Sequence, residues 1–551
     1  DESYIALELD VSGADGSEAG RARLNVYRVG YAPDDSPTVP FKSFVILPSV
    51  INEGNRHATH RLEITNLFGQ ISMTLDGQTS FAEKTEPPAE GRPRRRRGPE
   101  GESVNQTPMG RGGNYITFGL LCDIGFSVDA GQKAAFSDVV VSHHRTPHGV
   151  LFREDLARGA YEGLFAAATA DPQSGLRVDG GRYLLDGGAE GVFVVADPSR
   201  NATPMLRTEF EAADRPIRDA RLYVTARGIY EVYLNGSRVG EDHYNPGLTQ
   251  YNKTHLYQTY DVTDGIRPGP NALGAMLGEG WWSGLLSFGT IWNHFGDRQS
   301  LLAKLVVRYE DGSTDVVTTN PRDWTSFSDG PLRYSSLNLG EVYDATREAA
   351  IEGWSTPGYD DGAWAGARGV PLEGTGPTGS TTDFRGRTES FGYDGMSLIG
   401  QIGNNAGVFR TLTARSVEEV RDGVYVYDLG QNIVGVPRVT FDDGTAGRRV
   451  VLRVAEMLYP DLEESGANVG MIMTENYRAA LSQDIYIMKD GDQVYQPRFT
   501  SHGYQYLEIT GIDEALPLEA VQGIAISSVL DLAADYETSN PRVNQLWSNL
   551  V

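Results

Sequence analysis

Several residues of the chain could in principle carry out hydrolytic chemistry, but none stands in a catalytic pattern. The adjacent acids Glu241–Asp242 and Asp360–Asp361 could supply a general acid and a general base, yet both pairs lie in turn-like contexts without an evident partner. The sequence contains no G-x-S-x-G nucleophile elbow, no phosphate-binding glycine loop and no H-E-x-x-H zinc motif. We therefore assign no catalytic residue within these 551 residues.

Metal binding and thiol chemistry have one candidate segment each. His143, His144 and His148 lie in a polar stretch without a nearby carboxylate or helical spacing, which favours ordinary linker histidines over metal ligands. The single cysteine, Cys122, lies in the run GLLCDIGFSV, which predicts a buried strand and an inert thiol. One cysteine also excludes an intrachain disulfide and a cysteine-based metal site.

Tryptophan gives a clearer indication of function. Six of the seven tryptophans fall within one segment of the chain, at Trp281, Trp282, Trp292, Trp324, Trp354 and Trp364. Large aromatic faces stack on the apolar faces of sugar rings, and a few polar side chains complete such sites. The same residues could equally fill the core of a β-sandwich, because large aromatic side chains dominate cores. Both interpretations stay open, and the cluster marks a domain more surely than a site.

Asn235-Gly236 lies between two alternating runs in YEVYLNGSRVGEDHYNPGLTQY, which predicts a hairpin with a tight turn. Four asparagines stand in N-x-S/T sequons, and the tight turn makes Asn235 the poorest acceptor among them. The glycosylation candidates are therefore Asn105, Asn201 and Asn252.

Composition limits the classes of partner. The net charge is -26 and the pI is near 4.8, so the field of the protein repels phosphate backbones and anionic lipid surfaces, and we expect no nucleic acid or membrane partner. No run of eighteen apolar residues occurs, which predicts a soluble chain. The sequence opens at Asp1 with neither an initiator Met nor an apolar signal segment, so it does not report its compartment directly.

The elements that must position these residues are strands. Short alternating runs such as YIALELDV, RLYVTARGIYEVYL and VYVYDLG are separated by turn residues, which predicts an all-β chain of tandem β-sandwiches. The segment from Thr85 to Gly113, with Arg94 to Arg97, has almost no large apolar residue, and we expect a mobile surface loop there. One helix is predicted at the end, where Asn540 could cap, Pro541 fits the first position, and one face combines Val543, Leu546, Trp547 and Leu550.

Two stretches resemble the β-domains of bacterial and fungal α-L-rhamnosidases. The run ARLYVTARGIYEVYLNGSRVGEDHYNPGLTQYNKTHLYQTYDVTDGIRPGPNALGAMLGEGWWSG resembles their N-terminal jelly roll, and the W-S-T-P-G-Y-D-D-x-x-W element from Trp354 to Trp364 resembles its end. Further on, YVYDLGQNIVGVPRVTF and YQPRFTSHGYQYLEITG resemble the concanavalin-like sandwich of that family. The final ETSNPRVNQLWSNLV is similar to the opening of its six-hairpin α/α barrel.

The resemblance implies a division into domains. We expect an accessory β-sandwich over 1–145, a connecting segment over 146–204, a jelly roll over 205–395, a concanavalin-like sandwich over 396–530 and the start of a barrel over 531–551.

The resemblance also implies an activity. In the family, an acid and a base in the barrel hydrolyse terminal α-L-rhamnose with inversion, and the two carboxylates leave room for a water. Those residues belong beyond Val551, so this chain alone is expected to be inactive, with the missing barrel, in the same protein or in a second chain, as its partner. Rhamnose-containing glycosides or polysaccharides are the implied substrates, and an extracellular or periplasmic location is expected rather than a cytoplasmic one.

In some relatives the jelly roll binds rhamnose with the help of calcium, a cation that takes several oxygen ligands. The corresponding carbohydrate-binding candidates here are Tyr230, Glu231, Asn235, Glu279, Trp281 and Trp282. Glu231 and Asn235 are also the candidates for a calcium site, while catalysis itself requires no cofactor. Each of these residues also has an ordinary strand or turn role as an alternative.

Two other classes of function stay open. The chain could be a free-standing rhamnose-binding protein without hydrolytic activity, or a structural adhesive module that neither binds nor cuts rhamnose. The apolar face at Val543, Leu546 and Trp547 favours the enzyme, because a finished lectin should not end on an uncovered helix.

Overall fold

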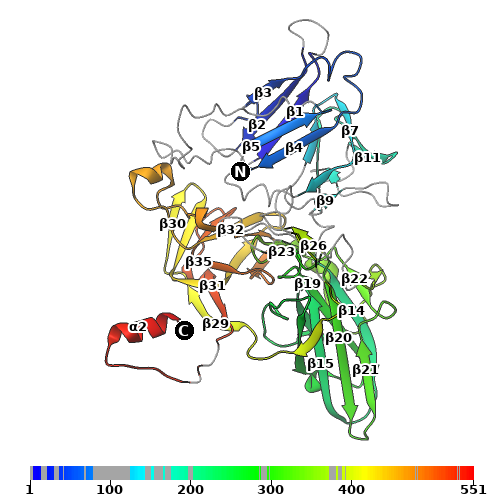
Figure 1. The fold of residues 1–551 in the computed structure, drawn as a ribbon, viewed down its shortest axis with the longest axis vertical. Coiled ribbons are helices and arrows are strands. Elements are labelled where there is room, and N and C mark those ends of the chain that lie inside the picture. Colours follow the sequence, from blue (N-terminus) through cyan, green and yellow to red (C-terminus); the bar gives the residue numbers. More distant parts are fainter. Residues whose placement is uncertain are drawn as a thin grey trace. The chain divides into compact units, whose positions relative to one another are not determined.

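The computed structural model describes residues 4–13, 21–29, 36–40, 42–67, 70–77, 125–142, 150–153, 165–167, 175–196, 203–284, 286, 294–296, 298–370, 380–382, 388–390, 392–477, 480, 482–529, 532 and 534–550. Across these residues the chain is built from strands, with one α-helix, α2 (Pro541–Leu550), and short 3₁₀ turns (Figure 1). The all-β prediction with tandem sandwiches is confirmed. The chain divides into two compact units, Asp1–Phe118 with Tyr459–Val469, and Gly119–Leu458 with Gly470–Val551.

The first unit contains a three-stranded antiparallel sheet and a separate hairpin. The strands are β1 (Tyr4–Asp10), β2 (Arg23–Val29), β3 (Lys42–Val45), β4 (Leu62–Leu67) and β5 (Gln70–Leu75). Its core is small and aliphatic, and comprises Ala22, Leu24, Val26, Ile46, Ile51 and Leu75.

The second unit begins with two three-stranded sheets, ordered β10-β13-β6 and β11-β12-β7, and a hairpin β8-β9. The strands are β6 (Gly125–Val128), β7 (Lys133–Phe136), β8 (Val140–Ser142), β9 (Val150–Arg153), β10 (Phe165–Ala167), β11 (Leu176–Asp179), β12 (Arg182–Asp186) and β13 (Val192–Ala196). Strands β6 and β7 thus share sheets with β13 and β12, although the sequence analysis assigned them to different segments. The alternation in RYLLD buries Tyr183 and Leu185 in the core that joins them.

The jelly roll follows as two packed sheets, antiparallel except for the edge strand β28 (Figure 1, green). One sheet comprises β17 (Ser237–Arg238), β16 (Ile229–Leu234), β19 (Gly269–Gly278), β14 (Met205–Ala212), β22 (Thr325–Phe327) and β25 (Ala365–Gly366). The other comprises β21 (Thr314–Thr318), β20 (Ser300–Tyr309), β15 (Ile217–Arg227), β18 (Thr254–Asp261) and β28 (Ser397–Gly400). Inward side chains of both sheets form one core, which includes Leu222, Val224, Val232, Leu273 and Leu305.

A ten-stranded sheet forms the rest of the second unit. Its strands are β23 (Leu332–Ser336), β24 (Gly340–Asp344), β29 (Gly407–Thr413), β30 (Ser416–Arg421), β31 (Val424–Gly444), β32 (Arg449–Ala455), β33 (Gln483–Ile487), β34 (Gly491–Tyr495), β35 (His502–Thr510) and β36 (Val521–Ser527). The long strand β31 pairs with β30, β34, β35 and β36. Its side chains therefore reach a core that several strands share.

The two β-domains of this unit exchange strands. The hairpin β23–β24 precedes the end of the jelly roll in sequence, yet β24 pairs in parallel with β33 of the ten-stranded sheet, for example Val342 with Ile485. Conversely, β28 follows the jelly roll and pairs in parallel with its strand β18. The connection between the domains is therefore a shared set of backbone hydrogen bonds, which the sequence analysis did not predict.

The terminal helix α2 forms where it was predicted. The Asn540 Oδ1 atom accepts a hydrogen bond from the Arg542 amide at 3.0 Å, which is an N-cap bond, and Pro541 takes the first helical position. No residue of α2 is buried within the described part of the chain. The described helices also include none that is long and apolar enough to span a bilayer. That α2 opens a barrel stays a prediction.

Candidate functional site

The tryptophans of the jelly roll divide by exposure. Trp282, Trp324, Trp354 and Trp364 are buried, and Trp282 is only 1% exposed. The Trp282 ring packs with Tyr251, Phe295 and Tyr393, and the Arg227 guanidinium lies 4.7 Å from its centroid. Trp281 is partly exposed, while Trp292 lies outside the described residues. Among the described members of the cluster, Trp281 is thus the one whose side chain is partly exposed.

Two of the predicted sugar contacts have structural partners. The Tyr230 hydroxyl is buried and donates to the Gln258 Oε1 atom at 2.7 Å. Asn235 adopts a φ of 51° and Gly236 a φ of 87°, as the predicted tight turn requires. The Asn235 amide donates to the Gly265 carbonyl and to Asn271, and its Oδ1 accepts from the Ala272 amide at 2.8 Å. These bonds tie the turn to its surroundings through every polar atom of the Asn235 side chain.

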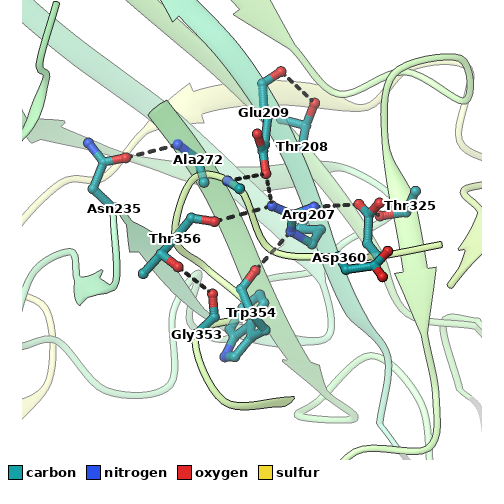
Figure 2. Close-up of polar contacts among 12 residues, drawn as sticks. Arg207, Thr208, Glu209, Asn235, Ala272, Thr325, Gly353, Trp354, Thr356 and Asp360 are labelled. Atoms are coloured by element: carbon teal, nitrogen blue, oxygen red, sulfur yellow. Dashed lines mark hydrogen bonds and ion pairs between the residues drawn. The ribbon is translucent and has the colours of Figure 1, made fainter. Parts of the chain in front are cut away.

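Arg207 anchors the loop that carries the tryptophan element. Its guanidinium is 2% exposed, donates to the carbonyls of Trp354 at 2.8 Å and Thr356 at 3.3 Å, and pairs with Glu209 at 2.5 Å (Figure 2). The fourth partner is the Asp361 carboxylate, which also accepts from the Thr325 hydroxyl at 3.0 Å. A buried guanidinium needs such a complete set of acceptors. Asp361 therefore has a structural role, because it holds the loop of the tryptophan element against Arg207 and Thr325.

Glu231 is a buried carboxylate that faces cations. Its Oε2 atom lies 2.9 Å from the Arg498 Nη1 atom and 2.7 Å from the Tyr233 hydroxyl, and Arg238 approaches the other oxygen at 3.4 Å. Burial alone would raise the pKa of Glu231, but the charges of Arg498 and Arg238 together lower it below its ordinary value. Glu231 therefore joins β16 of the jelly roll to the segment before β35.

Glu279 lies in the wall of a cavity of about 880 Å³, which Arg227, His255, Gln299 and Tyr334 also line. Desolvation raises the pKa of its carboxyl to about 8, and the Tyr334 hydroxyl, at 3.3 Å, offsets this only partly. Glu279 is therefore largely protonated at neutral pH and can donate as well as accept hydrogen bonds. Gly284 faces the carboxyl so closely that a Cβ atom there would lie 1.8 Å from Oε2.

The other acidic pair of the sequence analysis is also engaged. The Asp242 Oδ2 atom accepts from Asn405 Nδ2 at 2.7 Å, from the Tyr260 hydroxyl at 3.1 Å and from Asn245 at 3.3 Å. Like Asp361, it holds polypeptide segments together. Neither pair presents a free acid opposite a free base.

Glu231 and Asn235 do not fit a calcium ion as they are arranged. Two guanidinium groups approach the Glu231 carboxylate, and the Asn235 oxygen is used by a backbone amide. Calcium binds to clusters of six to eight oxygens that carry negative charge. Within the described ranges no group of three His, Cys, Asp or Glu side chains gathers as a metal site would require. Calcium elsewhere in this domain stays a prediction.

Several other candidates fall outside the part of the chain that the structure describes. These are Cys122, His143, His144 and His148, the segment Thr85 to Gly113, and the sequons at Asn105 and Asn201. Asn252 is described and lies in the turn before β18. Its glycosylation stays a prediction.

The structure does not gather the six sugar-binding candidates into one site. Glu279 belongs to the large cavity, Trp281 to a smaller pocket, and Glu231 to a buried ion pair. Sequence reasoning missed Arg207 and Arg498, which organise these surroundings, because neither lies in a recognisable motif. The smaller pocket adds Gln401 and Asn404, whose sequence signal is the short polar segment Gln401–Asn405, and Ser528, which no sequence pattern marks.

Comparison with known proteins identifies both β-domains. The model of the alpha-L-rhamnosidase N-terminal domain matches residues 215–380, and that of the bacterial alpha-L-rhamnosidase concanavalin-like domain matches residues 418–527. The chain belongs to the α-L-rhamnosidase family. The matched ranges cover most of the jelly roll and of the ten-stranded sheet.

Curated α-L-rhamnosidases from two bacteria support this membership. The one from Streptomyces avermitilis is 39% identical over 64% of this chain and 31% of its own length, and the one from an Alteromonas species is 36% identical over 63% and 35%. Among solved structures, the S. avermitilis α-L-rhamnosidase complexed with L-rhamnose superposes with a TM-score of 0.55 at 30% identity, over 77% of this chain and 44% of that one. This member of the α-L-rhamnosidase family thus spans about a third of the length of these curated relatives.

Proposed function

We propose that this chain is the β-domain part of an α-L-rhamnosidase that removes terminal non-reducing α-L-rhamnose from glycosides or polysaccharides. The observation that carries the proposal is the succession of the two rhamnosidase domains along one chain, at 215–380 and 418–527. Solved relatives share this fold at 30% identity, and one of them was crystallised with L-rhamnose. An extracellular or periplasmic location belongs to the same proposal.

The chemical step requires an acid and a base that face each other, and the described residues of this chain present no such pair. An inverting glycosidase places an acid and a base about 6.5–9.5 Å apart, so that a water attacks the anomeric carbon opposite the leaving group. One acid of each pair considered above serves as an anchor: Asp242 accepts from Asn405, and Asp361 pairs with Arg207. We therefore assign the acid and the base to an α/α barrel outside these residues, and the β-domains to holding the glycan beside it.

Hydrolysis assays test this proposal. The 551-residue chain and the complete protein that contains the barrel are each given an aryl α-L-rhamnoside, and release of the phenol is followed. We expect turnover by the complete protein alone, with the β-anomer of rhamnose as the first product by NMR. Turnover by the 551-residue chain would place the catalytic groups within it. Binding of rhamnose without turnover by either protein would favour the free-standing sugar-binding protein.

A further inference from the structure

The hairpin β23–β24 connects the jelly roll to the ten-stranded sheet. It follows β22 of the jelly roll along the chain, joins the ten-stranded sheet where β24 pairs with β33, and is followed by β25 of the jelly roll. In the described part of that sheet, β33 is the strand that pairs with the hairpin, and β23 lies at the edge. Opening of this one pairing would therefore release the hairpin from the sheet.

Glu341 on β24 is fully buried and holds the segment before β35. Its Oε2 atom accepts from the backbone amides of Arg498 at 2.9 Å and Phe499 at 3.3 Å, and its Oε1 atom lies 3.2 Å from the Tyr495 hydroxyl. One oxygen is thus occupied by two N–H donors. The other faces a hydroxyl, which accepts a hydrogen bond as readily as it donates one, so this oxygen can hold a proton.

A second acid, Asp484 on β33, is buried beside Glu341. Its Oδ1 atom accepts from the Glu341 amide at 2.9 Å, and its Oδ2 atom lies 2.9 Å from His502 Nε2. The His502 Nδ1 atom is buried and has no hydrogen-bond partner among the described residues. A charged imidazole would bury an unpaired N–H there, so the neutral form that donates from Nε2 fits the site. Both oxygens of Asp484 then accept N–H bonds, which favours its ionised form.

The charges around Glu341 do not favour a second ionised acid. Among the described residues, the guanidinium that faces it is that of Arg498, whose Nη1 atom already lies 2.9 Å from Glu231. Burial raises the pKa of Glu341 to about 8 and the charge of Asp484 adds to this shift, while the Arg498 amide offsets it in part. The other titratable groups that interact with it are Tyr244, Tyr343 and Tyr495.

We propose that Glu341 is a proton-operated latch, which holds the hairpin β23–β24 in the ten-stranded sheet while it is protonated and loosens the hairpin when it ionises. The protonated carboxyl group joins β24 to Tyr495 and to the segment before β35 without adding a buried charge. The ionised group places two carboxylates in one buried junction, where each opposes the other. The latch concerns the assembly of the two β-domains and goes beyond the proposed function.

The sign of the pH effect follows from the shift. A released hairpin exposes Glu341 to water, where its pKa returns to the ordinary value of 4.5, whereas the closed latch keeps the proton up to about pH 8. The stabilisation of the closed state is therefore complete below the lower value, declines as the pH rises, and is lost above the upper one. The latch is strong in acid and weak in alkali.

Hydrogen exchange at the backbone amides of β24 and β33 measures this opening. Glu279 contacts β23 through the Tyr334 hydroxyl and its pKa is also about 8, so the full chain carries Glu279→Gln in every sample. After correction for the intrinsic exchange rate, the equilibrium constant for opening should rise by about tenfold per pH unit between pH 5.5 and pH 7.5. It should level off above about pH 8.

Glu341→Gln is the deciding variant. A glutamine oxygen can accept from the same two amides while its NH₂ group donates to Tyr495, so the side chain imitates the protonated acid at every pH. Opening of β24 and β33 should then change by less than about twofold over the same pH range. Glu418→Gln, which alters an exposed glutamate on β30 of the same sheet, is the matched control and should keep the full rise.

A pH dependence that survives Glu341→Gln would overturn the latch. So would amides of β24 and β33 that exchange no faster than those joining β31 to β35, because the hairpin would then open only with the whole sheet. If Glu341→Gln does not fold, the chain with Glu341 intact still decides, since an opening constant that stays level from pH 5.5 to pH 7.5 excludes a proton on Glu341 as the latch. None of these measurements involves rhamnose, so they are independent of the hydrolysis assay.

Discussion

Glu231 lies on β16, and Glu279 directly follows the neighbouring strand β19. Their surroundings nevertheless move the pKa values of the two carboxyl groups in opposite directions. Two guanidinium groups beside Glu231 outweigh burial and keep that carboxylate ionised. Glu279 has only the Tyr334 hydroxyl, and desolvation raises its pKa to about 8. One residue type thus serves once as a permanent charge and once as a group that titrates near neutrality.

The titration of Glu279 predicts how stability varies with pH. Between its ordinary pKa of 4.5 and its folded value of about 8, the folded chain keeps a proton that the unfolded chain has released. The stabilisation that protonated Glu279 gives the folded state is therefore complete below the unfolded pKa. It is lost as the pH rises through the folded pKa. Between pH 5 and pH 8, Glu279→Gln should raise the free energy of unfolding by on the order of 1–3 kcal/mol relative to the parent, as measured by urea unfolding. The exposed Glu211→Gln is the control, and equal pH slopes for both variants would contradict the assignment.

The pair Glu231–Arg498 predicts a second effect. Arg498→Met leaves the buried Glu231 carboxylate with weaker partners, and we expect the free energy of unfolding to fall by about 3 kcal/mol. This is the low end of the range for a broken buried pair, because the Arg498 guanidinium is partly exposed. Glu231→Gln in the same chain should recover part of that loss. The exposed pair Arg322–Asp323 gives the comparison, since solvent screens it and Arg322→Met should lower the free energy of unfolding far less than Arg498→Met in the same urea experiment. Equal losses would show that burial does not decide the strength of the pair.

At the scale of elements, the turn after β16 predicts a difference between two glycines. Gly236 and Gly312 have φ values of 87° and 85°, so alanine is strained at both. Only at Gly236 would the added Cβ meet another atom, Thr356 Cγ2 at 2.9 Å. We expect Gly312→Ala to lower the free energy of unfolding by about 1 kcal/mol. Gly236→Ala should lower it by about 1 kcal/mol more, because the contact with Thr356 adds overpacking.

Thermal unfolding of the two alanine variants measures that difference. Thr356→Ser removes the Cγ2 atom and keeps the hydroxyl that donates to the Gly353 carbonyl at 2.7 Å. It should therefore abolish the extra cost of Gly236→Ala. If the double variant stays as unstable as Gly236→Ala alone, the contact is not the cause.

The same elements show what sequence can and cannot predict. The Asn235-Gly236 turn and the Asn540 cap of α2 are local, so two or three neighbouring residues sufficed to predict them. Glu231 and Arg498 are 267 residues apart, and Arg207 and Asp361 are 154 apart. No local pattern marks such partners. The exchange of β23–β24 into the second sheet was missed for the same reason, because strand pairing depends on the whole fold.

At the scale of the molecule, the cores are separate. The first unit is built on Leu24 and its aliphatic neighbours, and the jelly roll on a core that includes Leu305. A chain with independent cores does not unfold in one two-state step. We therefore expect calorimetry to resolve more than one transition, each of which depends on its own core.

Tryptophan fluorescence assigns these transitions, because all seven tryptophans lie in the unit Gly119–Leu458 with Gly470–Val551. Leu24 and Leu305 are each 1% exposed, and truncation of such a leucine to alanine costs about 2–5 kcal/mol. Leu24→Ala should lower one calorimetric Tm and leave the fluorescence transition in place, whereas Leu305→Ala should lower the fluorescence transition. A fluorescence transition that moves equally with both variants would mean that the two units unfold as one, so that loss of the first unit's core also destabilises the jelly roll and the ten-stranded sheet.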